Sequence, residues 1–284
     1  MVTMTIPSRR PNLPAVLVAF AAALASACGP SEPRTDAERL AKGREIIEKM
    51  SARLGAAQTL SVTTKEVRDQ LSPGGKPQTV TLNRETVVRR PDRVYFRTSG
   101  DLHNEGWYDG VGFTFAMHDQ KVFAQARMPE TLDKTLDAMH ERYGVATPIA
   151  DFIYSAPAKA LLSDSTTGGW VARETVDGQT ADHLSFKDTG VSWEIWIAAS
   201  GDPLPIKGHA EFPESNHLKK VDLAYSNWNL APTIADGQFD AKVPADFEGI
   251  AILQRARVLR NIPEDTAAPA AAPASDEKPG AAKK

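Results

Sequence analysis

The sequence predicts a mainly β fold of the α+β class, built on an antiparallel sheet with one N-terminal helix and one helical insertion. Short stretches in which every second residue is apolar recur about every ten residues. Turn signals rich in glycine, proline and aspartate separate these stretches. Most connections are also too short for the crossover helices that a parallel sheet requires. Together these observations predict a meander of short antiparallel strands.

The clearest strand signal is the stretch 192–212. Trp193, Ile195 and Ile197 occupy every second position, which is typical of a strand with one buried face. A turn follows at 199–203, where glycine and proline disfavour a helix. On the returning strand, small or apolar residues are expected to continue the buried face, and charged residues the opposite one. The first set is Leu204, Ile206, Gly208 and Ala210, and the second is Lys207, His209 and Glu211.

The composition favours a soluble globular protein of one or two domains with a sizeable core. The chain has 284 residues, of which 42% are hydrophobic, and its formal net charge is −3. A mildly acidic chain without a basic run lacks the electrostatic character of a nucleic-acid-binding protein. We therefore expect no nucleic-acid partner.

The N-terminal segment predicts export. Arg9 and Arg10 precede an apolar run over residues 13–27, which ends in small residues, as in a secretory signal peptide covering residues 1–27. The run is too short for a spanning helix, and no later stretch is long and apolar enough to cross a bilayer. Any attachment to a membrane is therefore expected to go through an anchor.

Cys28 is the sole cysteine and directly follows the small residues, as does the cysteine that is lipidated in bacterial lipoproteins. Ordinary cleavage is the alternative, because Ala25 stands where the lipidation motif prefers Leu, Val or Ile. We expect lipid attachment at Cys28, with residues 28–34 as a linker. The protein would then lie on the periplasmic side of the bacterial envelope. Gly29, in place of aspartate, favours the outer membrane over the inner one.

A helix is expected from about Thr35 to Leu54. Thr35 and Glu38 form the pattern of a capping box, in which each side chain accepts from a free backbone amide of the first turn. Apolar residues then recur at helical spacing, and Gly55 is suited to ending the helix. These residues are Leu40, Ile47, Met50 and Leu54. The stripe predicts a helix that packs on the sheet.

Six strands are expected between residues 60 and 126. The first begins at Leu60 and turns at 73–75 into a partner that extends to Val88. The other four are expected at 94–97, 105–108, 112–117 and 121–126.

The meander is then interrupted by a helical insertion, roughly residues 129–162. Pro129 suits the first turn of a helix, and an apolar stripe runs from there to Gly144. The stripe consists of Leu132, Leu136, Met139 and Tyr143. Pro148 and Pro157 begin two short helical turns. A long structured insertion is either a lid over a binding site or a layer that plugs the core, and the sequence favours neither.

Strands are expected again at 170–176, 180–186 and 218–228, with the hairpin described first between the last two. Residues 250–259 are expected to add either a helix or a strand. The segment 263–284 lacks aromatic residues and predicts a disordered tail rich in alanine and proline. Between the linker and this tail we expect one folded domain over residues 35–262.

Five sets of motifs occur together in the chain. They are WEIWI (193–197) followed by PLPIK (203–207), PDRV (91–94), WYDG (107–110), ERYGV (141–145) leading to DFIY (151–154), and SNWN (226–229). In this combination, over about residues 36–250, the chain resembles an uncharacterised family of predicted periplasmic proteins, a domain of unknown function. That family is itself similar in fold to the LolA/LolB-like lipoprotein carriers.

The resemblance implies a LolA-like domain over residues 35–262: a curved antiparallel half-open β-barrel around a helical lid, with an apolar hollow between them. It implies no reaction, because the family has none assigned. None of the carriers' functional residues is transferred to a position of this chain. The polar tail departs from the family pattern.

The sequence contains no pattern typical of an enzyme. It lacks a nucleophile elbow, a His-Glu-x-x-His motif and a phosphate-binding loop, and the GVG at 110–112 is typical of a hairpin turn. His103 with Glu105, and His209 with Glu211, share strand faces, but two ligands do not make a metal site. We therefore expect no catalysis, no cofactor and no bound metal.

Apolar side chains of the sheet converge if the sheet curls, and together with the insertion they are the candidate ligand-binding residues. They are Phe96, Phe113, Phe115, Leu132, Leu136, Met139, Tyr143, Phe152, Leu184, Phe186, Trp193, Ile195, Ile197, Leu223 and Tyr225. A filled core requires the same residue types as a cavity, so composition does not separate the two.

Two functions are compatible with these expectations. The first is an envelope lipoprotein that holds or carries an apolar ligand, either an acyl chain or a lipoprotein lipid, in the half-open barrel. The alternative is a non-enzymatic interaction module for envelope sensing or assembly, with an envelope protein as its partner. A continuous hollow with few polar groups favours the first, and a filled barrel with an exposed apolar patch favours the second.

Overall fold

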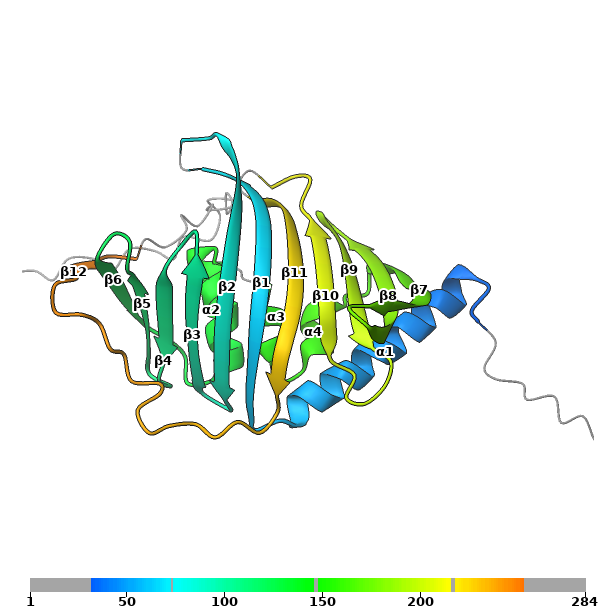
Figure 1. Ribbon diagram of the computed structural model, residues 1–284, viewed down its shortest axis with the longest axis horizontal. Helices are drawn as coiled ribbons and strands as arrows, with labels where there is room; N and C mark the ends of the chain where they lie inside the picture. The colour runs from blue at the N-terminus through cyan, green and yellow to red at the C-terminus, as the bar shows by residue number, and fades with distance from the viewer. Residues whose placement is uncertain (1–31, 73, 146–147, 216–217, 253–284) are drawn as a thin grey trace, which may run out of the picture.

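The computed structural model describes residues 32–72, 74–145, 148–215 and 218–252. The expected signal peptide, Cys28 and the C-terminal tail lie outside these residues. The described chain forms a single curved sheet of twelve strands, with helices packed behind it in the view of Figure 1. The predicted mainly β fold, with an N-terminal helix and a helical insertion, is confirmed.

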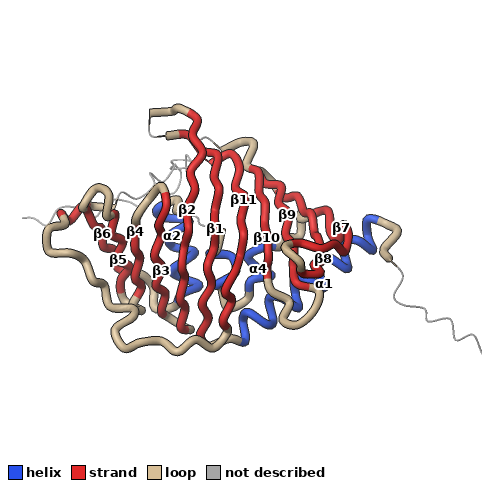
Figure 2. Tube along the Cα trace, viewed as in Figure 1, coloured by secondary structure: helices blue, strands red, loops and turns tan. Residues whose placement is uncertain are grey.

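The sheet has the strand order β12-β6-β5-β4-β3-β2-β1-β11-β10-β9-β8-β7. The strands are β1 (Thr59–Leu71), β2 (Pro77–Arg89), β3 (Arg93–Gly100), β4 (Asn104–Tyr108), β5 (Gly112–Met117), β6 (Val122–Arg127), β7 (Thr167–Val176), β8 (Gln179–Asp188), β9 (Val191–Ala198), β10 (Pro205–Glu211), β11 (Leu218–Asn229) and β12 (Glu248–Ile250). The edge strands β12 and β7 do not pair with each other within the described residues, so the sheet stays open. Figure 2 shows its curvature along the row of strands.

The chain builds this sheet from the centre outward and then returns. Strands β1 to β6 extend to one edge, and β7 to β11 come back from the opposite edge until β11 pairs with β1. Neighbouring strands are antiparallel except at β12, which pairs in parallel with β6. The sequence predicted antiparallel strands alone. The parallel pair forms because the long segment 230–247 runs along one end of the sheet before β12 begins (Figure 1).

Helix α1 (Asp36–Ala56) begins at the predicted capping box. The Thr35 hydroxyl accepts from the backbone N–H of Glu38 at 3.2 Å, and the Glu38 carboxylate accepts from the N–H of Thr35 at 3.0 Å. Gly55 does not end the helix as expected. It lies inside the helix, which continues until the N–H of Ala57 donates to the carbonyl of Leu54.

Helix α1 crosses β7 at backbone contact. A β-carbon at Gly43 would lie 2.8 Å from the α-carbon of Gly169, so glycine is needed in the helix at this crossing. Gly169 also has a φ of +143°, in the region that favours glycine, and a β-carbon there would lie 2.2 Å from the carbonyl oxygen of Arg39. The helix therefore fits closely on this end of the sheet.

The insertion between β6 and β7 contains α2 (Leu132–Tyr143), α3 (Ala150–Ile153) and α4 (Pro157–Leu161). Pro129 was expected in the first turn of α2 but precedes it. The N-cap is Thr131, whose hydroxyl accepts from the N–H of Lys134 at 3.4 Å. Gly144 ends the helix in the left-handed conformation, as the sequence predicted.

Polar side chains fasten the insertion to the rest of the fold. The guanidinium of Arg90 donates to the carbonyls of Ile153 and Tyr154, at 2.7 and 2.8 Å, and to that of Ala57 at 3.2 Å. Ser51 of α1 accepts from the first turn of α4. These hydrogen bonds therefore hold the short helices against the ends of α1 and β2.

The hairpin formed by β9 and β10 has the predicted faces, with one exception. Ile195 and Ile197 are buried in the main core, and Trp193 packs against it. Ile206 was expected on the same face, but it packs with Ala181 and Trp196 in a separate small cluster. The reason is a shift in register between Pro205 and Lys207, which breaks the alternation of faces.

Candidate functional site

The side of the sheet that carries the helices, called here the concave face, has two unlike halves. The half formed by β7 to β10 lies against α1. There Leu184, Phe186, Ile195 and Ile197 are at most 2% exposed. Phe186 reaches α1, where its ring lies 3.0 Å from the position of a β-carbon on Gly43. This half, the α1 half, is a filled core.

The other half, formed by β2 to β6 and called the α2 half, carries a cluster of aromatic rings. The rings of Phe96, Phe113 and Phe115 lie 6.2 to 6.5 Å apart, centre to centre. Phe96 lies across Gly106 of the next strand, where any β-carbon would come within 2.3 Å of the ring. Phe96 and Phe115 are partly exposed. Unlike the α1 half, this surface is not closed.

The apolar stripe of α2 belongs to the same half. Leu132, at the start of the helix, is buried, whereas Leu136, Met139 and Tyr143 are partly exposed. All four pack against the main core. The contact is therefore tight at Leu132 and again at Ala138, and looser at the larger side chains of the later turns.

The structure brings all the predicted ligand-binding residues into one contiguous apolar cluster. The buried ones are Phe113, Leu132, Phe152, Leu184, Phe186, Ile195, Ile197, Leu223 and Tyr225. The partly exposed ones are Phe96, Phe115, Leu136, Met139, Tyr143 and Trp193. Contact of these residues with a ligand stays a prediction.

A line of polar residues crosses the middle of the concave face, and the sequence analysis missed it. By register, Thr64 of β1 lies opposite Arg84 of β2, Arg84 opposite Thr98 of β3, and Thr98 opposite Asn104 of β4. We call these four residues the polar row. Tyr225 of β11 lies opposite Thr64 and continues the line.

The polar row contains a buried cation beside a buried anion. Arg84 is 5% exposed, and its Nε donates to the Thr98 hydroxyl at 3.2 Å. Its Nη1 lies 3.8 Å from the carboxylate of Glu66, which is fully buried and also accepts from Arg68. The guanidinium also lies over the Phe96 ring, 5.1 Å from its centre. Burial lowers the pKa of Arg84, and the charge of Glu66 opposes that shift.

Several oxygen atoms in and beside the polar row have no hydrogen-bond partner among the described residues. They are the hydroxyls of Thr64 and Thr86, one carboxylate oxygen of Glu66 and the side-chain oxygen of Asn104. Neither terminal nitrogen of Arg84 donates a hydrogen bond to a described residue. Buried polar groups are nearly always paired, because an unpaired one costs about 1–3 kcal/mol. Their concentration at one place makes this the most distinctive polar feature of the concave face.

Helix α3 covers the β11 end of the polar row. Burial raises the pKa of its Asp151 to about 6. Burial also raises the pKa of Tyr225, and the negative charges of Glu66 and Asp151 raise it further. The neighbouring Phe152 meets the Tyr225 ring edge-on at 5.4 Å. The insertion and the polar row are thus parts of one site.

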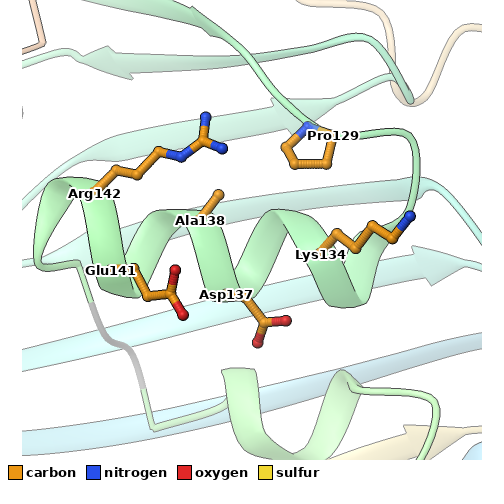
Figure 3. Close-up of a pocket in the computed structure, with 6 residues that line it drawn as sticks. All are labelled: Pro129, Lys134, Asp137, Ala138, Glu141 and Arg142. Carbon is orange, nitrogen blue, oxygen red and sulfur yellow. The ribbon is translucent and has the colours of Figure 1, made fainter. Parts of the chain in front are cut away.

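A shallow hollow of about 280 Å³ lies along α2 and is lined mostly by charged side chains (Figure 3). Its lining is Pro129, Lys134, Asp137, Ala138, Glu141 and Arg142. The Asp137 carboxylate accepts from the Tyr154 hydroxyl at 2.9 Å, so it helps to hold the insertion together. The four charged side chains carry two charges of each sign, which gives the hollow no preference for one sign of ligand.

The predicted histidine pairs lie apart from this site. His103 contacts Asp119 instead of Glu105, at 2.9 Å, while His209 contacts Asp222 at 2.7 Å and Glu211 at 3.5 Å. Within the described ranges, no three His, Cys, Asp or Glu side chains are grouped so that they could hold a metal ion. No helix in the same ranges is long and apolar enough to cross a membrane.

The comparison with family models agrees with the expected periplasmic location. A family model described as a predicted periplasmic protein (DUF2092) matches residues 43–253. No curated protein matches the chain.

Among solved structures, the chain is similar to an uncharacterised conserved protein of Thermus thermophilus, with 10% identity and a TM-score of 0.43. That match covers 73% of this chain and 98% of the other. It is similar to LprF of Mycobacterium bovis with 11% identity and a TM-score of 0.40, over 73% and 98%. It is similar to a LolA superfamily protein of Nitrosomonas europaea with 12% identity and a TM-score of 0.35, over 70% and 98%.

Proposed function

Because the chain belongs to the DUF2092 family of predicted periplasmic proteins, we propose that it is an envelope protein that holds an apolar ligand of the acyl-chain type. The ligand lies on the α2 half of the concave face. One observation carries the proposal: the aromatic cluster and the α2 stripe face the same core, yet both keep partial exposure. On the α1 half, four of the five predicted side chains are at most 2% exposed, and Trp193 is the one that is partly exposed.

The attachment of α2 suits exchange of such a ligand. The beginning of the helix is held, since the N–H of Leu132 donates to the carbonyl of Pro91 and Asp133 accepts from Ser155. The partly exposed side chains Leu136 and Met139 follow in the later turns. A ligand that replaces their contact with the apolar core would exchange one apolar contact for another, at a cost of a few kcal/mol or less. Helix α2 then acts as a lid hinged at its start, while α3 and α4 stay fastened to α1 and β2.

The proposal also covers the cellular location of the protein. Residues 1–27 direct export, Cys28 carries the lipid, and the domain faces the periplasm, at the outer membrane. Binding of the ligand requires no catalysis and no cofactor. Cys28→Ser should release the protein into the soluble fraction and abolish fatty-acid labelling. An unchanged membrane fraction for this variant would contradict the lipid anchor.

A docking module has less support from the surface. The large apolar residues that are exposed in the described chain belong to separate places: the β3–β4 and β4–β5 connections, the end of α2, β7 and β12. They are Leu102, Val111, Val145, Val171 and Ile250. Singly exposed apolar residues are normal on soluble proteins.

Leu136→Asp tests the lid. The parent protein should bind a fatty-acid probe whose fluorescence rises in apolar surroundings. The variant should bind it at least ten times more weakly, because the new charge replaces a side chain that packs against the apolar core. The barrel should still unfold in one transition near the parent's temperature. Arg142→Asp introduces the same side chain on the exposed face of α2 and should bind like the parent.

Two results would count against the proposal. One is the absence of probe binding by the parent protein. The other is complete unfolding of Leu136→Asp, which would mean that the insertion plugs a structural core.

A further inference from the structure

We propose that the polar row, together with Glu66 and Thr86, binds the polar group of the ligand, and that this group is a neutral amide joined to an acyl chain. This inference rests on the proposed function, because it names the chemical class of the same ligand.

The first argument is the balance of donors and acceptors. The unpaired oxygens of Glu66 and Asn104 can only accept hydrogen bonds, and the terminal nitrogens of Arg84, one of which lies 3.8 Å from Glu66, can only donate them. The Thr64 and Thr86 hydroxyls can do both. A group that fits all of these must itself donate and accept. An amide does so with its N–H and its carbonyl, whereas an ester or a carboxylate only accepts.

The second argument is charge. The buried or partly buried ionisable groups at the row are Glu66 and Asp151, against Arg68 and Arg84. Their formal charges cancel at neutral pH. A carboxylate or phosphate would add an unbalanced charge close to the free oxygen of Glu66, and burying such a charge is costly. A neutral polar group avoids that cost.

The third argument is position. Thr86 lies opposite Phe96 in the register of β2 and β3, and Arg84, two residues along the same face, lies over the Phe96 ring. Successive residues on one face of a strand are about 7 Å apart. An acyl chain on the aromatic cluster therefore places its polar end on the row. Asn104, at the β4 end, is partly exposed and marks the side that is open to water.

Ordered water molecules are the competing explanation, since water also donates and accepts. The two explanations differ in what they require of a ligand. If water fills the row, the affinity for a ligand should not depend on the polar group of its acyl chain, provided that the chain itself fits.

The experiment compares three ligands with one oleoyl chain: oleamide, methyl oleate and oleate. Each displaces the fluorescent fatty-acid probe from the full-length protein at pH 7. Oleamide should displace the probe at a concentration at least tenfold lower than either of the others. In the double variant Thr64→Val, Thr86→Val this preference should fall below threefold, while displacement by methyl oleate stays unchanged. Removing two hydroxyls that have no protein partner should leave the fold intact. Asn83→Ala, an exposed change next to Arg84 on β2, is the matched control and should keep the full preference.

Three other outcomes would each contradict a different part of the reasoning. Equal displacement by all three ligands, or strongest displacement by oleate, overturns the neutral amide and leaves the proposed function standing. An undiminished preference for oleamide in the double variant overturns the assignment to the row. If none of the three ligands displaces the probe, or the probe does not bind, the proposed function itself fails.

Discussion

Replacing Thr86 by valine should stabilise the protein, which is unusual for a change at a buried position. Thr86 is 2% exposed, and its hydroxyl has no partner among the described residues. Its neighbours across the strands on this face are Val62 and Phe96, so a valine side chain meets apolar surroundings of suitable shape. Most substitutions in a protein interior destabilise it, and so the sign of the effect is informative.

The expected magnitude follows from two contributions. An unpaired buried hydroxyl costs about 1–3 kcal/mol, and that cost disappears with the hydroxyl. The methyl group that takes its place adds about 0.8 kcal/mol of apolar burial. Because neighbouring atoms already relax part of the cost in Thr86, we expect a net gain of about 1–2 kcal/mol in the free energy of unfolding. For a domain of this size, the midpoint of thermal unfolding should rise by about 2–4 °C per kcal/mol.

Thr98→Val is the matched comparison. The Thr98 hydroxyl is buried as well, but it accepts from Nε of Arg84. Valine leaves that donor unpaired, and the free energy of unfolding should fall by about 1–3 kcal/mol. Urea unfolding of the parent and both variants, with equal slopes, measures the two changes on one scale.

A loss of about 1 kcal/mol or more in Thr86→Val would refute the reasoning. It would show that the hydroxyl has a partner in solution, most simply an ordered water molecule. Equal destabilisation by both valine variants would lead to the same conclusion, since it would remove the distinction between a paired and an unpaired hydroxyl.

Two further predictions concern the insertion and the core. The folded pKa of Asp151, about 6, is above its ordinary value of 3.8, so its proton is held more tightly in the folded protein than in the unfolded chain. Below about pH 4 the carboxyl is protonated in both the folded and the unfolded chain, so it does not change the stability. Between about pH 4 and 6 the free energy of unfolding of the parent should fall, by at most about 3 kcal/mol in total, because the unfolded chain gives up this proton more readily. Asp151→Asn should lack this fall in urea unfolding between pH 4 and 8, and parallel pH profiles would contradict the raised pKa. Ile195→Ala should lower the free energy of unfolding by about 2–5 kcal/mol, through lost burial and a cavity; a loss below about 0.5 kcal/mol would mean that the α1 half is not tightly filled.

The features that sequence predicted well are set by residues close together in the chain. The capping box of α1 joins Thr35 to Glu38, three residues away. The faces of β9 follow from strict alternation through Ile195 and Ile197. Where the alternation is broken, as by the shift in register before Lys207, the prediction for Ile206 was wrong, because a bulge leaves no mark in the hydrophobic pattern.

The polar row depends on pairing between distant strands and was therefore missed. Thr64 and Glu66 continue the buried phase of Leu60 and Val62, but a polar residue at the end of an apolar stretch reads as the point where a strand meets water. Burial at those positions arises because β1 lies in the centre of the sheet, paired along most of its length on both sides. The sequence did contain one indication of the row: Arg84 and Thr86 occupy the alternate positions of β2 at which the strand is buried.

The sequence also left open whether the apolar face is a core or a binding surface, and the structure shows why composition cannot decide. The same residue types line both halves of the concave face, but different helices cover them. On one half, the contact between Gly43 and Gly169 brings α1 to backbone distance, and the side chains beneath it lose nearly all exposure. On the other half, α2 is fixed at its first turn and leaves Phe96 and Phe115 in partial contact with water. Displacing side chains would disrupt close packing on the first half, whereas it would disrupt little on the second. The difference in exposure between the two halves therefore lies in how each helix is attached, which is encoded by a few glycine and hydrogen-bonding positions rather than by the apolar residues themselves.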